Sequence, residues 1–380
     1  MVEAEIAKLQ PLAIPMSENR LLTVNFSMHL TVIDGKVLSA ICGVKSAMTC
    51  PICEANPKTF NNLLNCEKGH FDPKPGRLRY GVSPLHAWIR FLEFCLHLSY
   101  RIEINQWQAR GPELQKRVKE RKEFVQNKLI EEMGLRVDFP KPDGSGTSND
   151  GNTARRAFRS HKHFASILGL QERLIKDIYI LLVSLSCQLP LDPEKFGRYC
   201  MDLAAYYVGN YSWYPMPSSV HKILIHGKDI IKESILPVGI LGEEGGESRN
   251  KIYKRDRLEH SRKSNRKFTM TDMFNRALDS SDPMLSSSHI TNRQKQRRRL
   301  ALPSEVIDLL ECPVLDLCPS DETTTAQIDR LEAEDEWEVV GNITLENEIP
   351  EVRRLVFRPM LSAVSCMLSG CCVKRIEDTF

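Results

Sequence analysis

The hydrophobic pattern changes from alternating to helical near residue 84, and this change predicts a mixed fold dominated by helices. Within residues 20–41, apolar and polar positions alternate, as in Leu22, Val24 and Phe26. An Asp-Gly pair at residues 34–35 interrupts the alternation, and this dipeptide favours a tight hairpin turn. The sequence therefore predicts a β-hairpin over residues 20–41.

From residue 84 onward, apolar residues recur every three or four positions, which is the period of an α-helix. The pattern predicts a mostly buried helix over residues 84–102 and an exposed helix over 112–133. Five further helices are predicted over residues 153–166, 171–186, 192–207, 218–234 and 247–263. A Gly/Ser/Asp-rich loop at 140–152 separates two of them, and a short apolar connector at 237–242 leads into the last. Beyond about residue 280 the chain becomes Ser-rich, Arg-rich and then acidic, so we expect low order there.

Composition adds a core and a charge asymmetry to this picture. The chain has 380 residues, of which 42% are apolar, and this is enough for a packed core in two to three domains. Residues 319–350 hold ten acidic residues against one Arg, a local net charge of −9. Because the whole chain has a net charge of +3, the remaining residues together carry +12. A basic body with an acidic appendage is typical of a polyanion-binding protein, although a solvated tail gives the same pattern.

The apolar runs and the cysteine content bear on the compartment. The run at residues 178–191 is shorter than the roughly 18 residues that a membrane span needs, and the N-terminus has no signal-peptide pattern. We therefore expect neither membrane insertion nor export. Twelve cysteines in such a chain predict free thiols or metal ligands in a reducing compartment.

Two spaced pairs offer zinc ligands. Cys50 and Cys53 form a Cys-x-x-Cys, a spacing that lets two thiolates reach one tetrahedral zinc ion. His221 and His226 form a His-x4-His on a predicted helix, roughly 170 residues further along the chain. Together they would make a Cys₂His₂ site that joins two distant segments. The alternatives are ordinary thiols and ordinary core or surface histidines.

A second ligand pair competes with the two histidines. Cys66 and His70 lie close enough in sequence to Cys50 and Cys53 to complete a compact local zinc knuckle. The spacing alone leaves both arrangements open.

A basic segment begins near residue 249, directly after a group of carboxylates. Glu243, Glu244 and Glu247 precede it, and residues 249–267 hold nine Lys or Arg against two acidic residues. Such a density of cations neutralises phosphates, and a carboxylate beside it can hold a divalent metal against a phosphodiester. Acidic residues at the start of a helix and a solvated basic face are the structural alternative.

Two arginines follow the Gly/Ser/Asp-rich loop. Asn152 or Thr153 is the expected N-cap of the next helix, and Arg155 and Arg156 follow in its first turns. Cations there oppose the helix dipole, so the pair is a candidate for contact with an anion. Two simply exposed arginines are the alternative.

The order of these motifs resembles a known family. Cys50-x-x-Cys53, Leu85-His86, the segment 151–156 (GNTARR), His221-x4-His226 and Glu247-Ser248-x-Asn250-Lys251 follow one another as in the C-terminal part of the V(D)J recombinase catalytic subunit and the related Transib transposases. The resemblance covers roughly residues 5–280.

The resemblance implies a partial RNase H-like fold of the DDE type, in an α+β and mostly α chain with a large zinc-stapled helical insertion. In this family two Asp and one Glu hold two Mg²⁺ or Mn²⁺ ions for DNA nicking and strand transfer. Glu247 matches the metal-binding Glu, and the structural zinc would be held by Cys50, Cys53, His221 and His226. The matching DNA-binding residues are Arg155, Arg156, Arg249, Lys251, Lys254, Arg255 and Arg257.

The resemblance also implies partners and a compartment. The expected partners are DNA, a second copy of the chain and an accessory recombinase subunit. The expected compartment is the nucleus, and no association with a membrane is expected. The implied domains are a partial RNase H-like β segment (1–45), the helical zinc insertion (46–236), the catalytic-Glu and basic helices (237–280) and the tail (281–380).

The chain departs from the family in its carboxylates. Both family aspartates would lie upstream of the matching region, and one carboxylate cannot fix two divalent ions. We therefore expect a recombinase or transposase fragment that binds DNA and zinc but does not cleave DNA alone. The alternative is a non-catalytic, zinc-stapled DNA-binding or interaction module. A hydrolase built on the Cys/His site is a weaker third possibility, because four protein ligands leave zinc no open position.

Overall fold

The computed structural model describes residues 8–15, 21–30, 32–33, 35–142, 146–282, 284, 287, 302–311 and 371–377. The chain divides into two compact units. The first, called here the helical unit, comprises residues 34–242 and 300–342. The second, called here the strand–hairpin unit, comprises residues 1–33, 243–299 and 343–380. The described elements confirm a mostly helical α+β chain.

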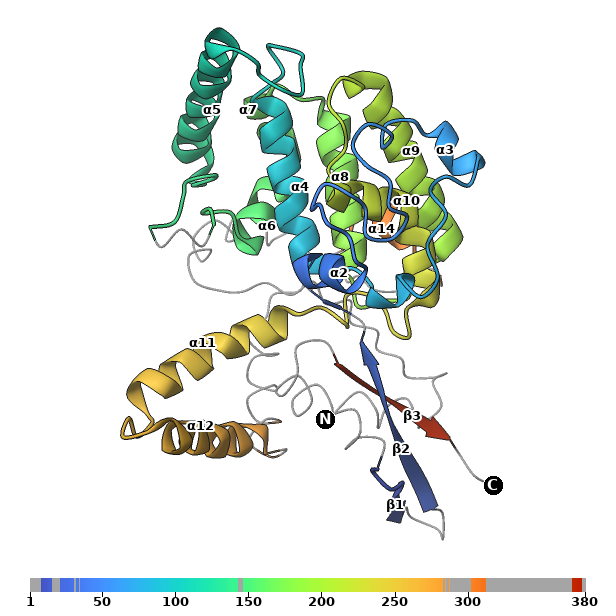
Figure 1. The fold of residues 1–380 in the computed structure, drawn as a ribbon, viewed down its shortest axis with the longest axis vertical. Helices are drawn as coiled ribbons and strands as arrows, with labels where there is room; N and C mark the ends of the chain where they lie inside the picture. The colour runs from blue at the N-terminus through green and yellow to red at the C-terminus, as the bar shows by residue number, and fades with distance from the viewer. Residues whose placement is uncertain are drawn as a thin grey trace, which may run out of the picture. The chain divides into compact units, whose positions relative to one another are not determined.

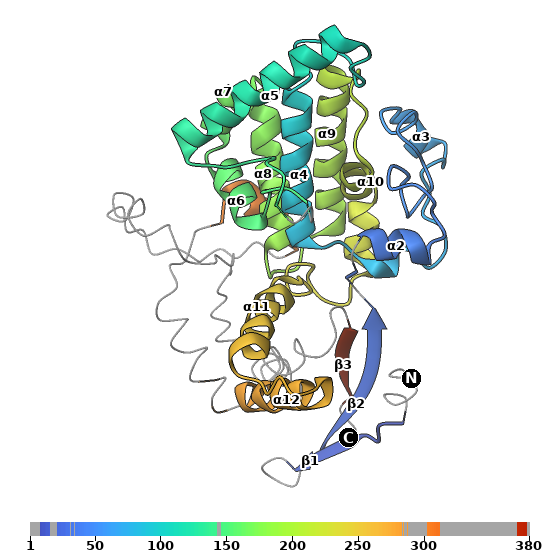
Figure 2. The same cartoon turned by 60° about the vertical axis from the view of Figure 1, so that its left-hand side comes forward.

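Four long helices form the centre of the helical unit. Helices α4 (Pro84–Ser99), α8 (Glu172–Ser186), α9 (Pro193–Tyr211) and α10 (Ser218–Glu233) lie side by side (Figures 1 and 2). The buried faces of α4 and α8 are almost wholly apolar, and Trp88 on α4 is among the largest fully buried side chains. Burial of these faces supplies the main driving force for the fold of this unit.

Shorter elements surround this centre. Helix α5 (Pro112–Met133) contacts α7 (His161–Leu168), and α6 (Gly151–Arg159) contacts α4 and α8. The segment before α4 contains α2 (Gly35–Ile41), α3 (Leu64–Glu67) and a 3-10 helix, η2 (Leu78–Tyr80), which contacts α10. As expected, α5 is exposed along most of its length.

Helix starts follow local capping chemistry. The Ser83 hydroxyl accepts the His86 amide at the start of α4, and Asp192 accepts two amides at the start of α9. The predicted cap of α6 is wrong, because Asp150 rather than Asn152 or Thr153 caps the helix by accepting the Thr153 amide at 2.7 Å. A carboxylate is the stronger acceptor there and also suits the positive end of the helix dipole.

The single helix predicted over 153–166 is two helices, α6 and α7, which meet at Ser160. Ser160 leaves helical geometry, with φ −93° and ψ 47°. The apolar period continues through the break, so the pattern could not reveal it. The change of direction lets both short helices contact α4 and α8.

The hairpin predicted over 20–41 is wrong in its second half. Residues 21–30 form strand β2 (Leu21–Leu30), but the following segment forms α2, and Asp34 lies outside the described residues. In α2 the Ser39 hydroxyl donates to the Gly35 carbonyl, and Leu38 is buried while Val37 is exposed. Seven residues are too few to separate a helical from an alternating pattern, and the bond from Ser39 to Gly35, four residues earlier, has the spacing of a helix.

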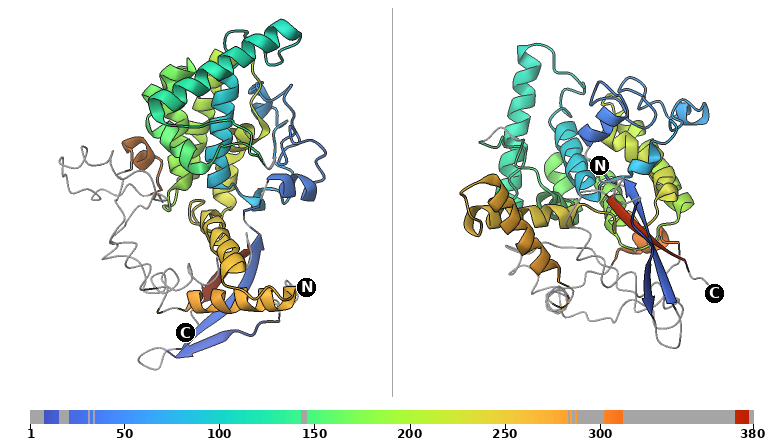
Figure 3. Two further views of the ribbon diagram at one scale, coloured as in Figure 1. Left: turned by 90° about the vertical axis from the view of Figure 1, so that its left-hand side faces the viewer. Right: turned by 60° about the horizontal axis from the view of Figure 1, so that its bottom comes forward.

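The strand–hairpin unit contains a small antiparallel sheet. Strand β2 pairs with β1 (Leu12–Pro15) on one edge and with β3 (Cys371–Glu377) on the other (Figure 3). The register with β1 places Pro15 opposite Leu21. The sheet shows that a strand lies near each end of the chain, and the described residues do not add the further strands of an RNase H-like sheet.

Two helices form the rest of the described part of this unit. Helix α11 (Glu244–Glu259) and α12 (Arg266–Ser281) contact each other as a helical hairpin. The helix predicted over 247–263 is thus confirmed, although it starts and ends earlier.

Beyond residue 282 the structure describes two elements, and the expectation of low order there stays a prediction. Helix α14 (Ser304–Asp308) packs on α8, where Lys176 Nζ and Glu305 Oε1 are 2.7 Å apart. Val306 is fully buried, and burial of this apolar side chain offsets the polar composition around it. Strand β3, which pairs with β2, is the second element.

Candidate metal centre

The two cysteines are positioned by a tight turn before α3. The Cys50 amide donates to the Ala55 carbonyl at 2.8 Å, and the Glu54 amide donates to the Cys50 carbonyl at 2.9 Å. Glu54 has φ 66°, which turns the chain sharply after Cys53. Both thiols are buried. The turn thus presents two sulfur atoms on one side of the loop.

Arg77 holds this turn in place. Its guanidinium donates to the Pro51 carbonyl at 2.9 Å and to the Cys42 carbonyl at 3.3 Å, and it pairs with the Glu54 carboxylate at 2.7 Å. The fixed fork of an arginine side chain suits three acceptors at once. The loop around the two thiols therefore has a defined shape of its own.

The two histidines come from neighbouring turns of α10. His221 and His226 are at most 1% exposed, and their ring centroids are 5.5 Å apart. Five residues is not a spacing that places two side chains on the same face, so the rings converge through their side-chain directions. Charged or polar side chains that are fully buried need partners, and this raises the question of what the two imidazoles bind.

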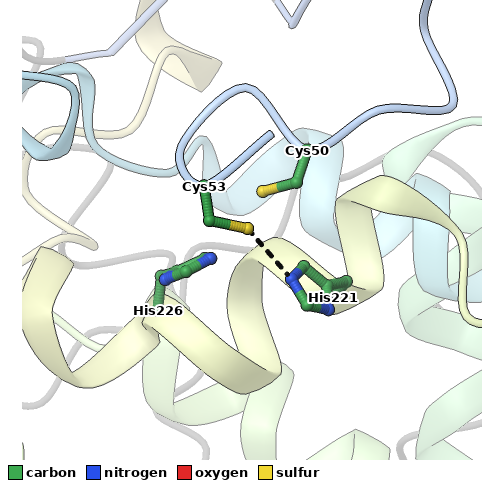
Figure 4. A group of neighbouring side chains, drawn as sticks. All are labelled: Cys50, Cys53, His221 and His226. Atoms are coloured by element: carbon green, nitrogen blue, oxygen red, sulfur yellow. Dashed lines mark hydrogen bonds between the residues drawn. The ribbon is translucent and has the colours of Figure 1, made fainter. Parts of the chain in front are cut away.

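All four side chains converge on one point. Cys50, Cys53, His221 and His226 offer ligand atoms that all lie within 4.8 Å of one another. Figure 4 shows the four side chains grouped between the loop and α10. Cys53 Sγ and His221 Nε2 are 3.5 Å apart. With the usual Zn–S and Zn–N bond lengths, two such ligands on a tetrahedral zinc are about 3.6 Å apart. The four residues therefore fit one zinc ion after a shift of about 1 Å in the other ligand atoms.

An unpaired nitrogen atom supports this fit. Within the described part of the chain, His226 Nε2 is buried and has no hydrogen-bond partner. His221 Nδ1 also has none, but the metal would bind the other nitrogen of that ring, Nε2, which faces Cys53. A buried polar atom without a partner costs about 1–3 kcal/mol. A metal ion bound to His226 Nε2 would remove that cost.

Aromatic rings orient His221. Phe60 stacks on the imidazole at a centroid distance of 4.2 Å, and Phe71 meets it edge-on at 4.6 Å. Both phenylalanines are buried. They exclude water and fix the ring plane, a task that a hydrogen-bonded partner performs in many metal sites.

The pKa shifts of Cys50 and His221 suit metal binding, whereas the shift of Cys53 does not. A hydrogen bond from Cys53 outweighs burial and lowers the pKa of Cys50, and the same interaction raises the pKa of Cys53. Burial lowers the pKa of His221, which favours the neutral imidazole that metals bind. Burial also lowers the pKa of Lys222 to about 8, and its ammonium donates to the Gly81 carbonyl at 2.6 Å.

The structure does not bring the competing pair into this group. His70 is exposed, and its Nδ1 lies 3.1 Å from the Asn65 amide oxygen. Cys66 is half-buried and does not belong to the group of four. The structure therefore favours the long-range set of Cys50, Cys53, His221 and His226 over the local knuckle with Cys66 and His70.

Glu247 lies elsewhere and is exposed. It occupies the first turn of α11 together with Glu244, where carboxylates are favoured by the helix dipole. Among the residues that the structure describes, no other group of three or more His, Cys, Asp or Glu side chains converges as the Cys₂His₂ group does. Glu247 thus belongs to no such group within the described part, and the expected Mg²⁺ or Mn²⁺ site there stays a prediction.

The basic residues of α11 divide between two faces. Arg249 faces α12, since its guanidinium donates to the Ser280 hydroxyl and lies 5.2 Å from the Tyr253 ring centroid. The remaining candidates on this helix are exposed, namely Lys251, Lys254, Arg255 and Arg257. Four cations therefore face solvent along one helix.

The two arginines of α6 have intramolecular contacts. The Arg155 guanidinium lies 5.6 Å from the Trp88 ring centroid, and Arg156 donates to the Met133 carbonyl at 3.2 Å, at the C-terminus of α5. These contacts favour the structural alternative, and DNA contact by this pair stays a prediction.

Sequence reasoning missed one buried polar group. Asp138 is buried in the loop after α5, 2.9 Å from the Asn149 amide, 3.3 Å from His97 and 3.5 Å from Lys122. Its partners come from α4, α5 and the Gly/Ser/Asp-rich loop. No local motif links them, so the pattern gave no signal.

Comparison with known proteins adds no family assignment. No known protein-family model matches the chain, and no curated protein sequence matches it either. Within the described residues, no helix has the length and apolar character to cross a membrane.

Proposed function

We propose that this chain is a zinc-stapled, DNA-binding piece of a DDE-type recombinase or transposase of the V(D)J recombinase and Transib kind. The observation that carries the proposal is the convergence of Cys50 and Cys53 with His221 and His226, across a separation of 168 residues between Cys53 and His221. Compact zinc fingers close much shorter loops. A staple of this length between a turn and a distant helix is the arrangement that the family resemblance implies.

Zinc would act in this protein as a structural ion. The four side chains would supply a complete tetrahedron of two sulfur and two nitrogen ligands, which leaves no position for a reacting water. Binding would tie the segment before α4 to α10, so part of the binding free energy becomes folding free energy.

DNA would contact the exposed cations of α11. Lys251, Lys254, Arg255 and Arg257 present four positive charges to solvent, and few aromatic side chains lie among them for stacking on bases. Contacts of this kind bind phosphates with little dependence on sequence. The proposal extends to a nuclear location, to a homodimer and to an accessory recombinase subunit.

The second candidate function is a non-catalytic DNA-binding or interaction module. The exposure of Glu247 favours it, since this residue belongs to no group of three or more metal-ligating side chains in the described part of the chain. The two candidates share zinc and DNA binding and differ in the role of Glu247.

Salt dependence tests DNA binding. Replacing Lys254, Arg255 and Arg257 together by Ala should weaken binding to unrelated duplexes alike and reduce the slope of log K against log salt by up to about 2.7, at 0.9 per phosphate contact. The matched control replaces Lys116, Arg117 and Lys119, which are exposed on α5, and should leave the slope unchanged. Equal slopes for all three proteins would contradict DNA binding by α11.

A further inference from the structure

The turn that joins α11 to α12 is held in a defined shape by α12 (Figure 1). Arg262 in this turn donates its backbone amide and two guanidinium nitrogens to the Asp272 carboxylate, at 2.8–3.0 Å. The Thr269 hydroxyl donates to the Arg262 carbonyl at 2.7 Å. The Asn265 side chain caps α12 by accepting the Phe268 amide at 2.9 Å. All of these residues belong to one compact unit.

This turn presents an aromatic ring at the surface. Phe268 is 41% exposed, and the Arg262 guanidinium lies 4.7 Å from its ring centroid. A guanidinium at this distance is attracted to the face of the ring. Because Asp272 fixes the guanidinium in turn, the ring has a preferred orientation although much of it is exposed.

Cations surround the ring in the sequence without acidic neighbours. Residues 260–271 contain Arg262, Lys263, Arg266 and Lys267, and they contain no Asp or Glu. Lys263, Arg266 and Lys267 are exposed. The surroundings of Phe268 therefore suit a ligand that carries negative charge.

A second exposed ring shows what is particular to Phe268. Phe124 on α5 is 48% exposed, and the Arg121 guanidinium lies 5.1 Å from its ring centroid. Glu120 and Glu123, however, lie within one helical turn of Phe124 and pair with lysines of α5 at 3.9 Å. An exposed ring with a stacked arginine thus occurs on both helices, whereas the purely basic surroundings distinguish Phe268.

The ring lies on a different face from the exposed apolar side chains of α12. Met270, Phe274 and Leu278 are exposed at i, i+4 and i+8 and share one side of the helix. At 3.6 residues per turn, Phe268 lies about 160° around the helix from Met270 and about 120° from Phe274. A lipid surface or a protein that covered the apolar side would not reach the ring. The charges around Phe268 therefore indicate its ligand.

An exposed ring beside several cations has the two parts of a site for single-stranded nucleic acid. The cations bind the phosphates, and the ring stacks on a base. Bases inside a duplex are already stacked on both faces, so only an unpaired base offers a free face to the ring. The turn thus suits a strand where it leaves a duplex.

We propose that the α11–α12 turn binds single-stranded DNA, with an unpaired base on the Phe268 ring and the adjoining phosphates on Lys263, Arg266 and Lys267. The choice of DNA rests on the proposed DNA binding by α11, whereas the stacking rests on the turn alone. Because the turn follows α11 directly, a strand that leaves a duplex bound to the α11 cations continues onto it.

Fluorescence anisotropy with the full-length, zinc-loaded protein tests this site. The probes are a blunt duplex and the same duplex with a short single-stranded thymine extension. The extension should raise affinity by about tenfold, near the lower end of what one stacked base contributes. Phe268→Leu should remove this gain and leave affinity for the blunt duplex unchanged, because leucine is apolar but has no aromatic face. Phe268→Tyr should keep the gain.

The matched control is Phe124→Leu, which removes an equally exposed ring with a stacked arginine and should leave the gain unchanged. Iodouracil placed in the extension should photo-cross-link to Phe268, as identified by mass spectrometry. Equal affinity for both duplexes would overturn the proposal. A gain that survives Phe268→Leu, or that Phe124→Leu removes as well, would also overturn it.

Further probes separate this site from other ligands and from the proposed function. Tighter binding of a ribonucleotide extension of equivalent sequence would overturn the assignment to DNA. Phe268-dependent binding to vesicles of phosphatidylserine and phosphatidylcholine, without a gain from the extension, would assign the ring to a membrane instead. Phe268-dependent binding of a free thymine oligonucleotide without any binding of the blunt duplex would support the site and contradict duplex binding by α11.

Discussion

At the residue scale, the four candidate zinc ligands place two thiols and two imidazoles in a buried site. Each ligand atom lies within 4.8 Å of the others, and Phe60 and Phe71 close the site around His221. Without a metal, the unpaired His226 nitrogen leaves a polar atom desolvated. The arrangement is therefore expected to gain stability from zinc rather than merely to tolerate it.

The first prediction is that zinc binds at one equivalent per chain. His226→Ala should abolish stoichiometric binding and lower the melting temperature by several degrees, because one of four ligands is lost and binding is coupled to folding. His70→Ala is the matched control and should change neither value, since His70 is exposed. Metal analysis and thermal denaturation measure both. Loss of zinc from the His70 variant but not from the His226 variant would show that the local set with Cys66 and His70 binds zinc instead.

A second residue-scale feature is the buried carboxylate of Asp138. Burial raises its pKa, but the hydrogen bond and charge of His97, with the contributions of Lys122 and Asn149, outweigh burial and lower the pKa to about 2. The folded protein thus holds this proton less tightly than the unfolded chain, where an Asp titrates near 3.9. Its stabilisation is present above pH 4 or so and is lost as the pH falls toward about 2.

The second prediction follows from that shift. Asp138→Asn should reduce the free energy of unfolding by about 2 kcal/mol at neutral pH, and the difference from the native protein should shrink toward zero as the pH falls through about 4 to 2. Urea unfolding at several pH values measures it. Asp202→Asn, an exposed carboxylate on α9, is the control. The difference in unfolding free energy between the native protein and the Asp138→Asn variant reports on Asp138 alone, because protonation of the zinc ligands affects both proteins alike.

At the element scale, two ion pairs link α12 to α11 and to the turn that follows it. Asp256 is buried and its carboxylate is 3.0 Å from Arg276, while Arg262 binds Asp272 through two side-chain nitrogens. Removing one partner of a buried ion pair leaves an uncompensated charge, which costs more than the pair contributes. The hairpin should therefore respond to the loss of Arg276 more strongly than to the loss of both partners.

The third prediction uses that asymmetry. Arg276→Ala should increase amide hydrogen exchange across residues 249–281, and adding Asp256→Asn should restore part of the protection because the buried charge is then gone. Exchange in the helical unit serves as the internal control. Equal or greater exchange in the double variant would show that the pair contributes through attraction and not through compensation of a buried charge.

The elements also show where a local pattern fails. Residues 35–41 alternate well enough to suggest a strand, yet burial of Leu38 and the Ser39 hydroxyl bond to Gly35 belong to a helix. The break at Ser160 is equally hidden, because apolar residues continue at helical spacing on both sides of it. In each case neighbours from distant sequence decide the geometry.

At the scale of the whole molecule, the proposed catalytic history can be tested directly. The fourth prediction is that the chain alone does not nick DNA with Mg²⁺ or Mn²⁺, because one carboxylate cannot position two metal ions. A fusion with a segment that supplies two aspartates from a related transposase should nick, and Glu247→Gln in that fusion should abolish nicking while zinc and DNA binding persist.

Variants of the neighbouring carboxylates serve as controls for the assignment of Glu247 as the metal-binding residue. Glu243→Gln and Glu244→Gln should each leave nicking by the fusion largely intact. Loss of nicking through Glu244→Gln alone would shift the metal-binding position to that residue. Nicking by the unfused chain that survives Glu247→Gln would contradict the family interpretation and favour another active site.

Features that depend on residues close together in the sequence could be predicted from the pattern alone. Helical spacing predicted the long helices α4, α5 and α8 to α11, because a 3.6-residue period records which face of a helix is buried. The two pairs Cys50, Cys53 and His221, His226 were visible as metal ligands from residue type and spacing, and charge counts separated the basic body from the acidic segment.

Features that depend on contacts between residues far apart in the sequence became visible in the folded chain. Spacing could not choose between His70 and the α10 histidines, and the choice follows from the packing of the Cys50–Cys53 turn against α10. It could not reveal that Asp138 gathers His97, Lys122 and Asn149, or that α12 turns its polar face to α11. A local pattern reports how much of a side chain is buried, whereas the chain's three-dimensional path determines against which residues it is buried.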